Sequence, residues 1–171
     1  MDLEEEGTAR QFNQTQYDCI ISCVKKRDFS EWNNQLESAT AAYTSIYQGN
    51  NINRPAHGSA ELEGADFSSL SLPGIDLSSG NLSRVSFYKS QLAGTVFDNA
   101  VLDHASFFGA DLLDASFTLA VLSDADLRSA NLEQAELKET KLDRADFREA
   151  TLDDAGFFRA KGKEVNFSLT S

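Results

Sequence analysis

The sequence predicts an all-β solenoid covered at one end by an α-helical cap. A Leu or Phe recurs every five residues between residues 62 and 167, and Ala often stands two residues before it. Residues 8–58 lack this repeat and instead space their apolar residues as a helix does. A period of five fits neither a helix nor a single flat strand, so the chain is a repeat protein.

The five-residue register is held over twenty-two consecutive positions, and Gly162 is its single exception. We call the Leu or Phe the centre of each unit. Ala stands two before the centre in fourteen of these units, so both side chains face the same way in an extended segment. The residues flanking the centre are mostly polar and face outward, and the remaining residues suit a turn. Each unit therefore predicts one short side of a stacked coil.

The Phe centres indicate how many sides make one coil. All eight fall on alternate units, which gives a period of ten, and twenty is the smallest multiple that closes a plausible square. Residues twenty apart are then neighbours on adjacent coils. We number four columns of sides, beginning at Leu62 (column one), Phe67 (column two), Leu72 (column three) and Leu77 (column four). Phe stacks on Phe along columns two and four, which are opposite walls.

Several units approach one consensus, Ala-(Asp/Asn)-Leu followed by two variable residues. The clearest copies are Ala110-Asp111-Leu112, Ala125-Asp126-Leu127, Ala130-Asn131-Leu132 and Ala145-Asp146-Phe147. Residues 60–169 thus resemble the pentapeptide-repeat family. The resemblance implies a right-handed quadrilateral β-helix.

The N-terminal segment is predicted to form a helical cap, because an exposed solenoid end needs covering. Apolar residues at 17, 20, 21 and 24 have helical spacing, and Ser30 resembles the N-cap of a second helix that Gly49 stops. We expect helices over residues 15–48, joined at residues 26–29, with Trp32 buried against the repeats. The division is therefore 1–58 for the cap and linker and 59–171 for the repeat solenoid.

The C-terminal coil is predicted to be an open edge. Gly162 replaces the expected centre, so that side loses its inward anchor and gains backbone freedom. Two outcomes follow: an end-to-end homodimer through the coil of Phe157 and Phe167, or mobility beyond about residue 160.

No catalytic set is visible in the sequence. His57 and His104 lack a Ser or Cys that the register would place beside them, and no phosphate loop or zinc spacing occurs. Cys19 and Cys23 share a helix face and are interpreted as buried structural thiols. The carboxylates occupy outward repeat positions, where solvation explains them better than acid–base chemistry. We therefore predict no enzyme activity, and no catalytic, cofactor-binding or metal residue.

The net charge limits the classes of partner that the chain is expected to bind. The net charge is −12, with −3 on residues 1–59 and −9 on residues 60–171, counted from 8 acids and 5 bases, then 19 acids and 10 bases. Direct binding to nucleic acid is disfavoured by this charge. No apolar stretch reaches the ~18 residues that span a membrane, and the acidic start lacks the features of a signal peptide. A cytoplasmic location and no membrane contact are expected.

The surface pattern predicts where a protein partner binds. Outward positions of column three carry five carboxylates and no base: Asp111, Asp114, Glu133, Asp153 and Asp154. Tyr88 and Phe108 are twenty apart in column two, so we expect them to stack as an exposed apolar contact. An acidic wall suits a basic protein, although outward Asp and Asn also keep such a rod soluble.

These observations favour a non-enzymatic protein–protein interaction module, a rigid acidic β-helical rod. The family resemblance implies an alternative, a DNA mimic that binds or protects a topoisomerase such as DNA gyrase. The sequence departs from those relatives, since it lacks their C-terminal dimerisation helix and projecting loops and adds the N-terminal cap.

Overall fold

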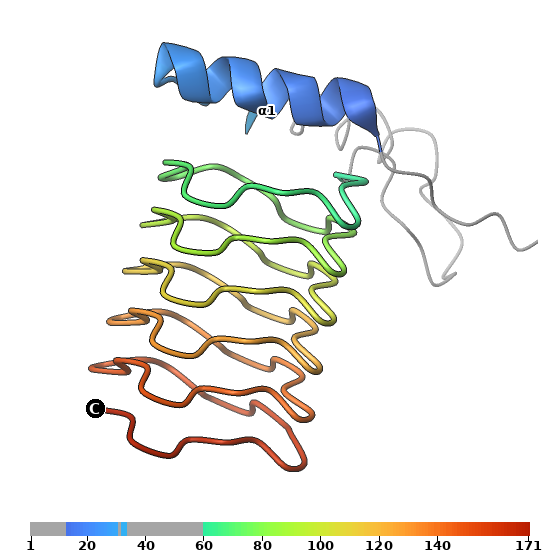
Figure 1. The fold of residues 1–171 in the computed structure, drawn as a ribbon. Helices are drawn as coiled ribbons and strands as arrows, with labels where there is room; N and C mark the ends of the chain where they lie inside the picture. Colours follow the sequence, from blue (N-terminus) through green and yellow to red (C-terminus); the bar gives the residue numbers. More distant parts are fainter. Residues whose placement is uncertain (1–12, 31, 34–59) are drawn as a thin grey trace, which may run out of the picture.

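The computed structural model describes residues 13–30, 32–33 and 60–171. Helix α1, Gln14–Lys26, is followed by a stack of repeat coils from residue 60 to residue 171 (Figure 1). α1 lies across the first coil, and the C-terminal coil lies at the other end of the stack. Most of the expected second helix and the linker at 49–58, with the domain boundary and His57, lie outside the described residues.

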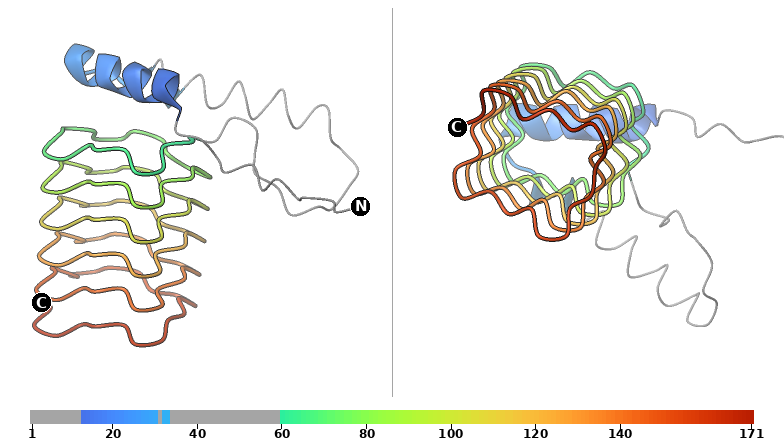
Figure 2. Two further views of the ribbon diagram at one scale, coloured as in Figure 1. Left: turned by 45° about the vertical axis from the view of Figure 1, so that its right-hand side comes forward. Right: turned by 90° about the horizontal axis from the view of Figure 1, so that it is seen from below.

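Each coil contains twenty residues, because parallel bridges join residues twenty apart, beginning with Glu61–Asn81. Figure 2 shows the coils stacked one on another, from the side and from below. One bridge occurs in each five-residue unit, so four units make one coil. Backbone hydrogen bonds tie neighbouring coils: Leu62 N donates to Asn81 O at 2.9 Å, and Asn81 N donates to Ala60 O at 2.7 Å. The prediction that residues twenty apart are neighbours is confirmed.

A tight turn follows each centre. In the first unit Ala65 N donates to Leu62 O at 3.0 Å, and Gly64 between them has a φ of +73°. Positive φ at the third residue of such a turn is the type II pattern. The φ at this position is positive in every unit, including those with Arg84 or Glu139, where a side chain makes it cost about 1–2 kcal/mol. The hydrogen bonds between coils offset that strain.

The sides of the coil are shorter than the sequence led us to expect. Each coil-to-coil contact in residues 60–171 is an isolated one-residue bridge, and no extended strand forms there. The reason is geometric, since two of the five residues in each unit make the turn and leave no room for a strand. The all-β description therefore holds only as a ladder of bridges.

The core consists of the centres and the residues two before them. The Leu and Phe centres from Leu62 to Phe147 are buried, and aromatic rings pack in both Phe columns. The Phe97 and Phe117 ring centroids are 4.9 Å apart at an interplanar angle of 10°, and Phe87 faces Phe97 across the core at 5.6 Å and 70°. Such ring pairs contribute about 0.5–1.5 kcal/mol beyond burial. The predicted aromatic columns are confirmed.

Three hydroxyl side chains replace Ala inside the core, and each has a backbone acceptor. Ser90 Oγ donates to Phe67 O at 2.6 Å, Thr95 Oγ1 to Leu72 O at 3.1 Å, and Thr140 Oγ1 to a carbonyl of its own turn. A buried hydroxyl without a partner costs about 1–3 kcal/mol, so these bonds make the substitutions tolerable.

Helix α1 has defined ends and one buried face. Asn13 Oδ1 accepts from Gln16 N at 3.1 Å at the N-cap, and Arg27 ends the helix in the left-handed conformation at a φ of 55°. Ile20 and Cys23 are fully buried on the face toward the coils. Cys23 is thus a buried thiol as predicted, while Cys19 is half-buried.

α1 covers the first coil by bonding to its free backbone edge. Asn13 N donates to Glu61 O at 2.8 Å, and Gln16 Oε1 accepts from Glu61 N at 2.8 Å. The Tyr17 hydroxyl donates to Asp66 O at 3.0 Å. In later coils the equivalent backbone groups of the repeat bond to the preceding coil. At Glu61 and Asp66 the helix takes the place of that coil.

The helical turn after α1 continues this cover. Trp32 is 2% exposed, and its Nε1 donates to Asp76 O at 2.6 Å. Asn33 Oδ1 accepts from Asp76 N at 2.9 Å, and Asn33 Nδ2 donates to Gly74 O at 3.2 Å. The prediction that Trp32 is buried against the repeats is confirmed.

The start of this turn differs from the sequence prediction. Ser30 was expected to be the N-cap, but Asp28 Oδ1 accepts from Ser30 N at 2.9 Å, and Asn33 N donates to Phe29 O. Asp28 therefore supplies the capping oxygen. The same bond to the Ser30 backbone lowers the pKa of Asp28. The helical turn therefore starts at Ser30 itself, one residue earlier than an N-cap at Ser30 would give, because Asp28 provides the capping oxygen.

Gly162 is accommodated by its neighbour in the turn. A Cβ on Gly162 would collide with Val165 Cγ2, and would lie 2.9 Å from Leu142 O. Val165 stands where most units carry Ala, so its larger side chain fills the space that a Leu centre would occupy. The inward anchor expected to be lost at residue 162 is supplied by Val165.

Candidate interaction surface

The five predicted carboxylates lie on one side of the stack, over three successive coils. We call Asp111, Asp114, Glu133, Asp153 and Asp154 the acidic wall. Asp111 bridges Asn131, which bridges Thr151, so the wall follows column three at about 4.8 Å per coil. Asp114, Asp153 and Asp154 are exposed, and Asp111 and Glu133 are half-buried. The structure thus places all five in the predicted column.

None of these carboxylates makes an ion pair with a base in the described part of the chain. Their partners are neutral amides: Asn131 Nδ2 donates to Asp111 Oδ1 at 3.0 Å, and Gln134 Nε2 to Glu133 Oε1 at 3.4 Å. Like charges on facing positions repel, and a bound cation would relieve that repulsion. The acidic wall is therefore unneutralised negative charge.

Column two shows the contrasting arrangement. Arg128 donates to both oxygens of Asp126, at 2.8 and 2.9 Å. Arg148 clamps Asp146 in the same way, with Nη2 to Oδ2 at 2.7 Å. This bond lowers the pKa of Asp146, and the Asp126 carboxylate raises the pKa of Arg128. Asp126 and Asp146 are thus neutralised by arginines of their own column, whereas the carboxylates of the acidic wall are not.

Tyr88 and Phe108 stack as predicted, with ring centroids 5.7 Å apart at 15°. Cations flank the pair: Lys89 Nζ lies 5.2 Å from the Tyr88 ring centroid, and the Arg128 guanidinium 5.2 Å from that of Phe108. Tyr88 is 40% exposed. Phe108 is half-buried, so the pair is partly accessible to a partner.

The aromatic pair and the acidic wall meet at one corner of the coil. Phe108 ends a side of column two, Gly109 turns the corner with a φ of +64°, and Asp111 begins the next side. The two sets of candidate residues therefore adjoin on the third coil. A single partner can contact both.

His104 lies away from this corner, in a hollow of about 410 Å³ on column one. Its Nε2 is 3.9 Å from Asp124 Oδ2, and no hydrogen bond joins it to a hydroxyl among the described residues. Arg144 donates to both oxygens of Asp124 at 2.6 Å and lowers the pKa of that carboxyl. Both oxygens of Asp124 are therefore hydrogen-bonded to Arg144, and the described residues of this hollow contain no hydrogen-bonded nucleophile–base pair.

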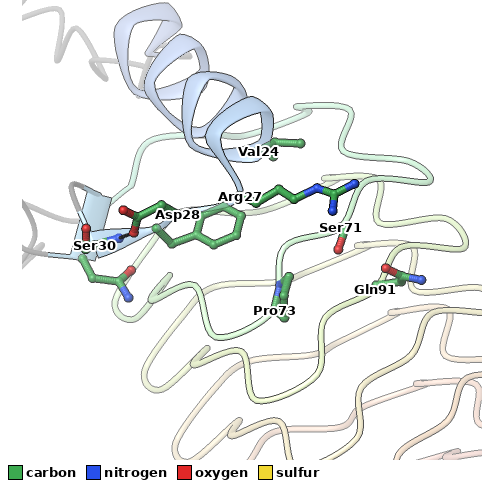
Figure 3. Close-up of a pocket in the computed structure, with 9 residues that line it drawn as sticks. Val24, Arg27, Asp28, Ser30, Ser71, Pro73 and Gln91 are labelled. Atoms are coloured by element: carbon green, nitrogen blue, oxygen red, sulfur yellow. Dashed lines mark hydrogen bonds between the residues drawn. The ribbon is translucent and has the colours of Figure 1, made fainter.

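A larger hollow, of about 880 Å³, lies between the end of α1 and column three of the first two coils. Figure 3 shows Arg27 extending from the helix end toward Ser71, with Pro73 and Gln91 along the other wall. Sequence reasoning missed this hollow because it forms only where the cap meets the solenoid. The Arg128 and Arg148 clamps had a visible signal, Asp and Arg two residues apart on one side of a coil.

Among residues 13–30, 32–33 and 60–171 no cluster of three His, Cys, Asp or Glu side chains is arranged to hold a metal ion. The helices of this part of the chain are too short or too polar to cross a membrane.

The repeat defines the class of protein. Eight copies of the pentapeptide-repeat model match the chain over residues 60–99, 86–124 and 120–157. The chain therefore belongs to the pentapeptide-repeat family. No curated protein matches it.

Solved pentapeptide repeat proteins resemble the chain more loosely. One from the Arabidopsis thaliana thylakoid lumen is 28% identical over 58% of this chain and 59% of its own, with a TM-score of 0.39. One from Nostoc is 26% identical over 74% and 94%, at 0.32. QnrB1, a plasmid-mediated fluoroquinolone resistance protein, is 16% identical over 70% and 86%, at 0.33. The chain spans 59% of the Arabidopsis protein, and the family assignment depends on the repeat match alone.

Proposed function

We propose that the chain is a non-enzymatic protein–protein interaction module whose acidic wall binds a basic segment of a partner protein. In this proposal the solenoid is a right-handed quadrilateral β-helix and acts as a rigid scaffold. It needs no cofactor and binds neither nucleic acid nor membrane directly. The observation that carries the proposal is a contrast between columns: Asp126 and Asp146 of column two are each bound by an arginine, and no carboxylate of the acidic wall is.

The adjoining aromatic pair supports the same surface. Tyr88 and Phe108 offer apolar area next to Asp111, and interfaces combine such aromatic anchors with a charged rim. A basic partner with an apolar side chain beside its cations would contact both sets. The acidic wall then sets the rate and salt dependence of association, and the aromatic pair adds buried area.

The test is a quantitative pull-down with two charge-matched variants. The first neutralises the acidic wall through Asp111→Asn, Asp114→Asn, Glu133→Gln, Asp153→Asn and Asp154→Asn. The control neutralises five acids on columns one and four, at Asp103, Glu136, Glu139, Asp143 and Glu164. A partner retained by the wild type and the control, lost by the first variant, and released by salt supports the proposal. Equal retention by all three proteins overturns it.

The DNA-mimic function is a second proposal that uses the same acidic wall. It requires that the chain binds a topoisomerase such as DNA gyrase in place of duplex DNA. A supercoiling assay with purified gyrase and a quinolone separates the two proposals. Protection that disappears in the acidic-wall variant supports mimicry, and unchanged inhibition leaves the basic-partner proposal alone.

A further inference from the structure

Two lysines stand side by side on column one with no counter-charge. Lys141 and Lys161 are parallel bridge partners, and both are exposed. Neither makes an ion pair with any residue that the structure describes. Neighbouring coils are about 4.8 Å apart, so the two side chains leave the backbone as direct neighbours. Facing like charges destabilise a bridge, which marks this pair as a place where an anion would be stabilising.

The lysines line a groove of about 720 Å³ at the corner between columns four and one. Leu119, Glu139 and Arg159, each twenty residues from the next, line its other wall, and Thr140 and Ala160 lie between the walls. We call Leu119, Lys141, Arg159 and Lys161 the basic groove. Leu119 is 50% exposed and lies at the apolar end, two coils from Arg159. The groove therefore has an apolar end and a cationic end.

One acid, Glu139, lines the groove, and Glu136 and Asp143 belong to the same two columns. Glu139 pairs loosely with Arg159 at 3.9 Å, and Glu136 covers the backbone at Gly156, where an added Cβ would lie 2.9 Å from its Oε1. Asp143 accepts from the backbone N of Lys163 at 2.8 Å. Salt at about 0.15 M screens exposed charges beyond about 8 Å. The groove lining thus carries three cations against one carboxylate, although the chain as a whole carries −12.

We propose that the basic groove binds an acidic segment of a partner protein, in which two carboxylates follow an apolar side chain by two or three residues. Leu119 lies one coil from Lys141 and two from Lys161, about 5 and 10 Å along the stack. An extended chain advances about 3.3 Å per residue, which gives the stated spacing. The two lysines of the groove lie on column one, opposite the acidic wall of column three, so the chain can hold partners of both signs at once.

The experiment uses the full chain and a fluorescein-labelled peptide whose centre reads Leu-Ser-Glu-Glu, followed by fluorescence anisotropy at about 0.15 M salt. The double variant Lys141→Gln, Lys161→Gln is expected to weaken binding about tenfold. Leu119→Ser is expected to weaken it as well, because it removes the apolar end. The control Lys89→Gln removes an exposed lysine on column two and should leave the affinity unchanged. Thermal melting of each variant checks that the fold persists.

The outcomes are decisive in both directions. Binding that depends on both the lysines and Leu119, and that a peptide with Leu-Ser-Lys-Lys at its centre does not show, supports the proposal. An oligonucleotide or inorganic polyphosphate is the competing probe. If it binds as tightly as the Leu-Ser-Glu-Glu peptide, and its binding is reduced by the lysine variant but not by Leu119→Ser, the groove is an unspecific polyanion site and the proposal is overturned. Absent binding, or binding that ignores the lysine variant, also overturns it. None of these results depends on the acidic wall, so the proposed function is tested separately.

Discussion

Phe107 and Phe117 meet edge to face across the core, with ring centroids 5.7 Å apart and an interplanar angle of 87°. Each ring also stacks on the Phe twenty residues before it, Phe87 at 5.2 Å and Phe97 at 4.9 Å. The middle of the solenoid is therefore a block of interlocking rings. Removal of one ring deprives several others of contacts at once.

Phe107→Ala is expected to lower the free energy of unfolding by about 3–5 kcal/mol, as large deletions in a packed core do. The control is Phe108→Ala, whose ring faces outward and loses mainly one stacking contact of about 0.5–1.5 kcal/mol. Urea denaturation followed by circular dichroism measures both. Equal losses for the two variants would contradict the buried column.

Trp32→Phe tests whether the cap is part of the fold. The substitution keeps an aromatic ring but removes the N–H that donates to Asp76 O. An unsatisfied buried carbonyl costs about 1–3 kcal/mol, so we expect a loss of that size. Hydrogen exchange should become faster in the first coil, for example at Leu77 N, before it changes in the third coil. Uniform exchange and unchanged stability would show that the cap contributes nothing.

The solenoid could be predicted because every unit repeats one physical arrangement. A centre and a small residue two before it both point inward, so the register, the coil length and the ring stacks of Phe87 and Phe107 follow from the order of residues. The absence of extended strands from residues 60–171 could not be predicted in this way. Two residues of each unit form the turn, although the repeat pattern alone does not distinguish them from extended residues. Compensation at Gly162 was also missed, since Val165 reads as a minor change from Ala until the two side chains are placed together.

The candidate site was predictable in position but not in electrostatics. Column three was visible as a set of carboxylates, because outward positions follow directly from the register. Which acids stay unpaired depends on the conformations of long side chains. Arg128 and Arg148, for example, turn back onto the Asp of their own side of the coil. The hollow beside Arg27 depends on how the cap docks, and no local pattern encodes that.

The pair of Asp124 and Arg144 predicts a pH dependence of stability. Its hydrogen bonds lower the pKa of Asp124 below the ordinary 3.8 in the folded chain. A carboxyl whose pKa is lowered by folding stabilises the folded chain. This stabilisation is fully present above the ordinary pKa and is lost as pH falls through the folded-state pKa. We expect Asp124→Asn to melt below the wild type at neutral pH and to approach it in strong acid.

Arg144→Gln removes the cause of that shift and serves as the control. The Asp124 carboxyl should then titrate closer to its ordinary value, which an NMR titration of the side-chain carboxyl measures. An identical titration with and without Arg144 would contradict the pairing.

The C-terminal coil predicts a concentration-dependent homodimer. Phe167 stacks on Phe147 at 5.0 Å with one ring face, yet it is 43% exposed, and Leu169 is 81% exposed. A second copy that meets this coil would cover both residues. Sedimentation of the wild type should show association that Phe167→Asp abolishes. Fast relaxation of backbone amides beyond about residue 160 in a persistent monomer would instead support the mobile alternative.

Lys161→Glu tests the unneutralised pair in the basic groove through stability alone. In this variant Lys141 faces a negative charge instead of a positive one. An opposite-charge pair on neighbouring strands stabilises by about 0.2–1 kcal/mol, whereas a like-charge pair destabilises. We expect the free energy of unfolding to rise by about that amount at low salt, with Lys161→Gln in between. The gain should shrink as salt is added, because both side chains are exposed. Lower stability of Lys161→Glu at low salt would mean that Lys141 and Lys161 do not repel each other in the folded chain, and the groove would lose the cationic character on which anion binding depends.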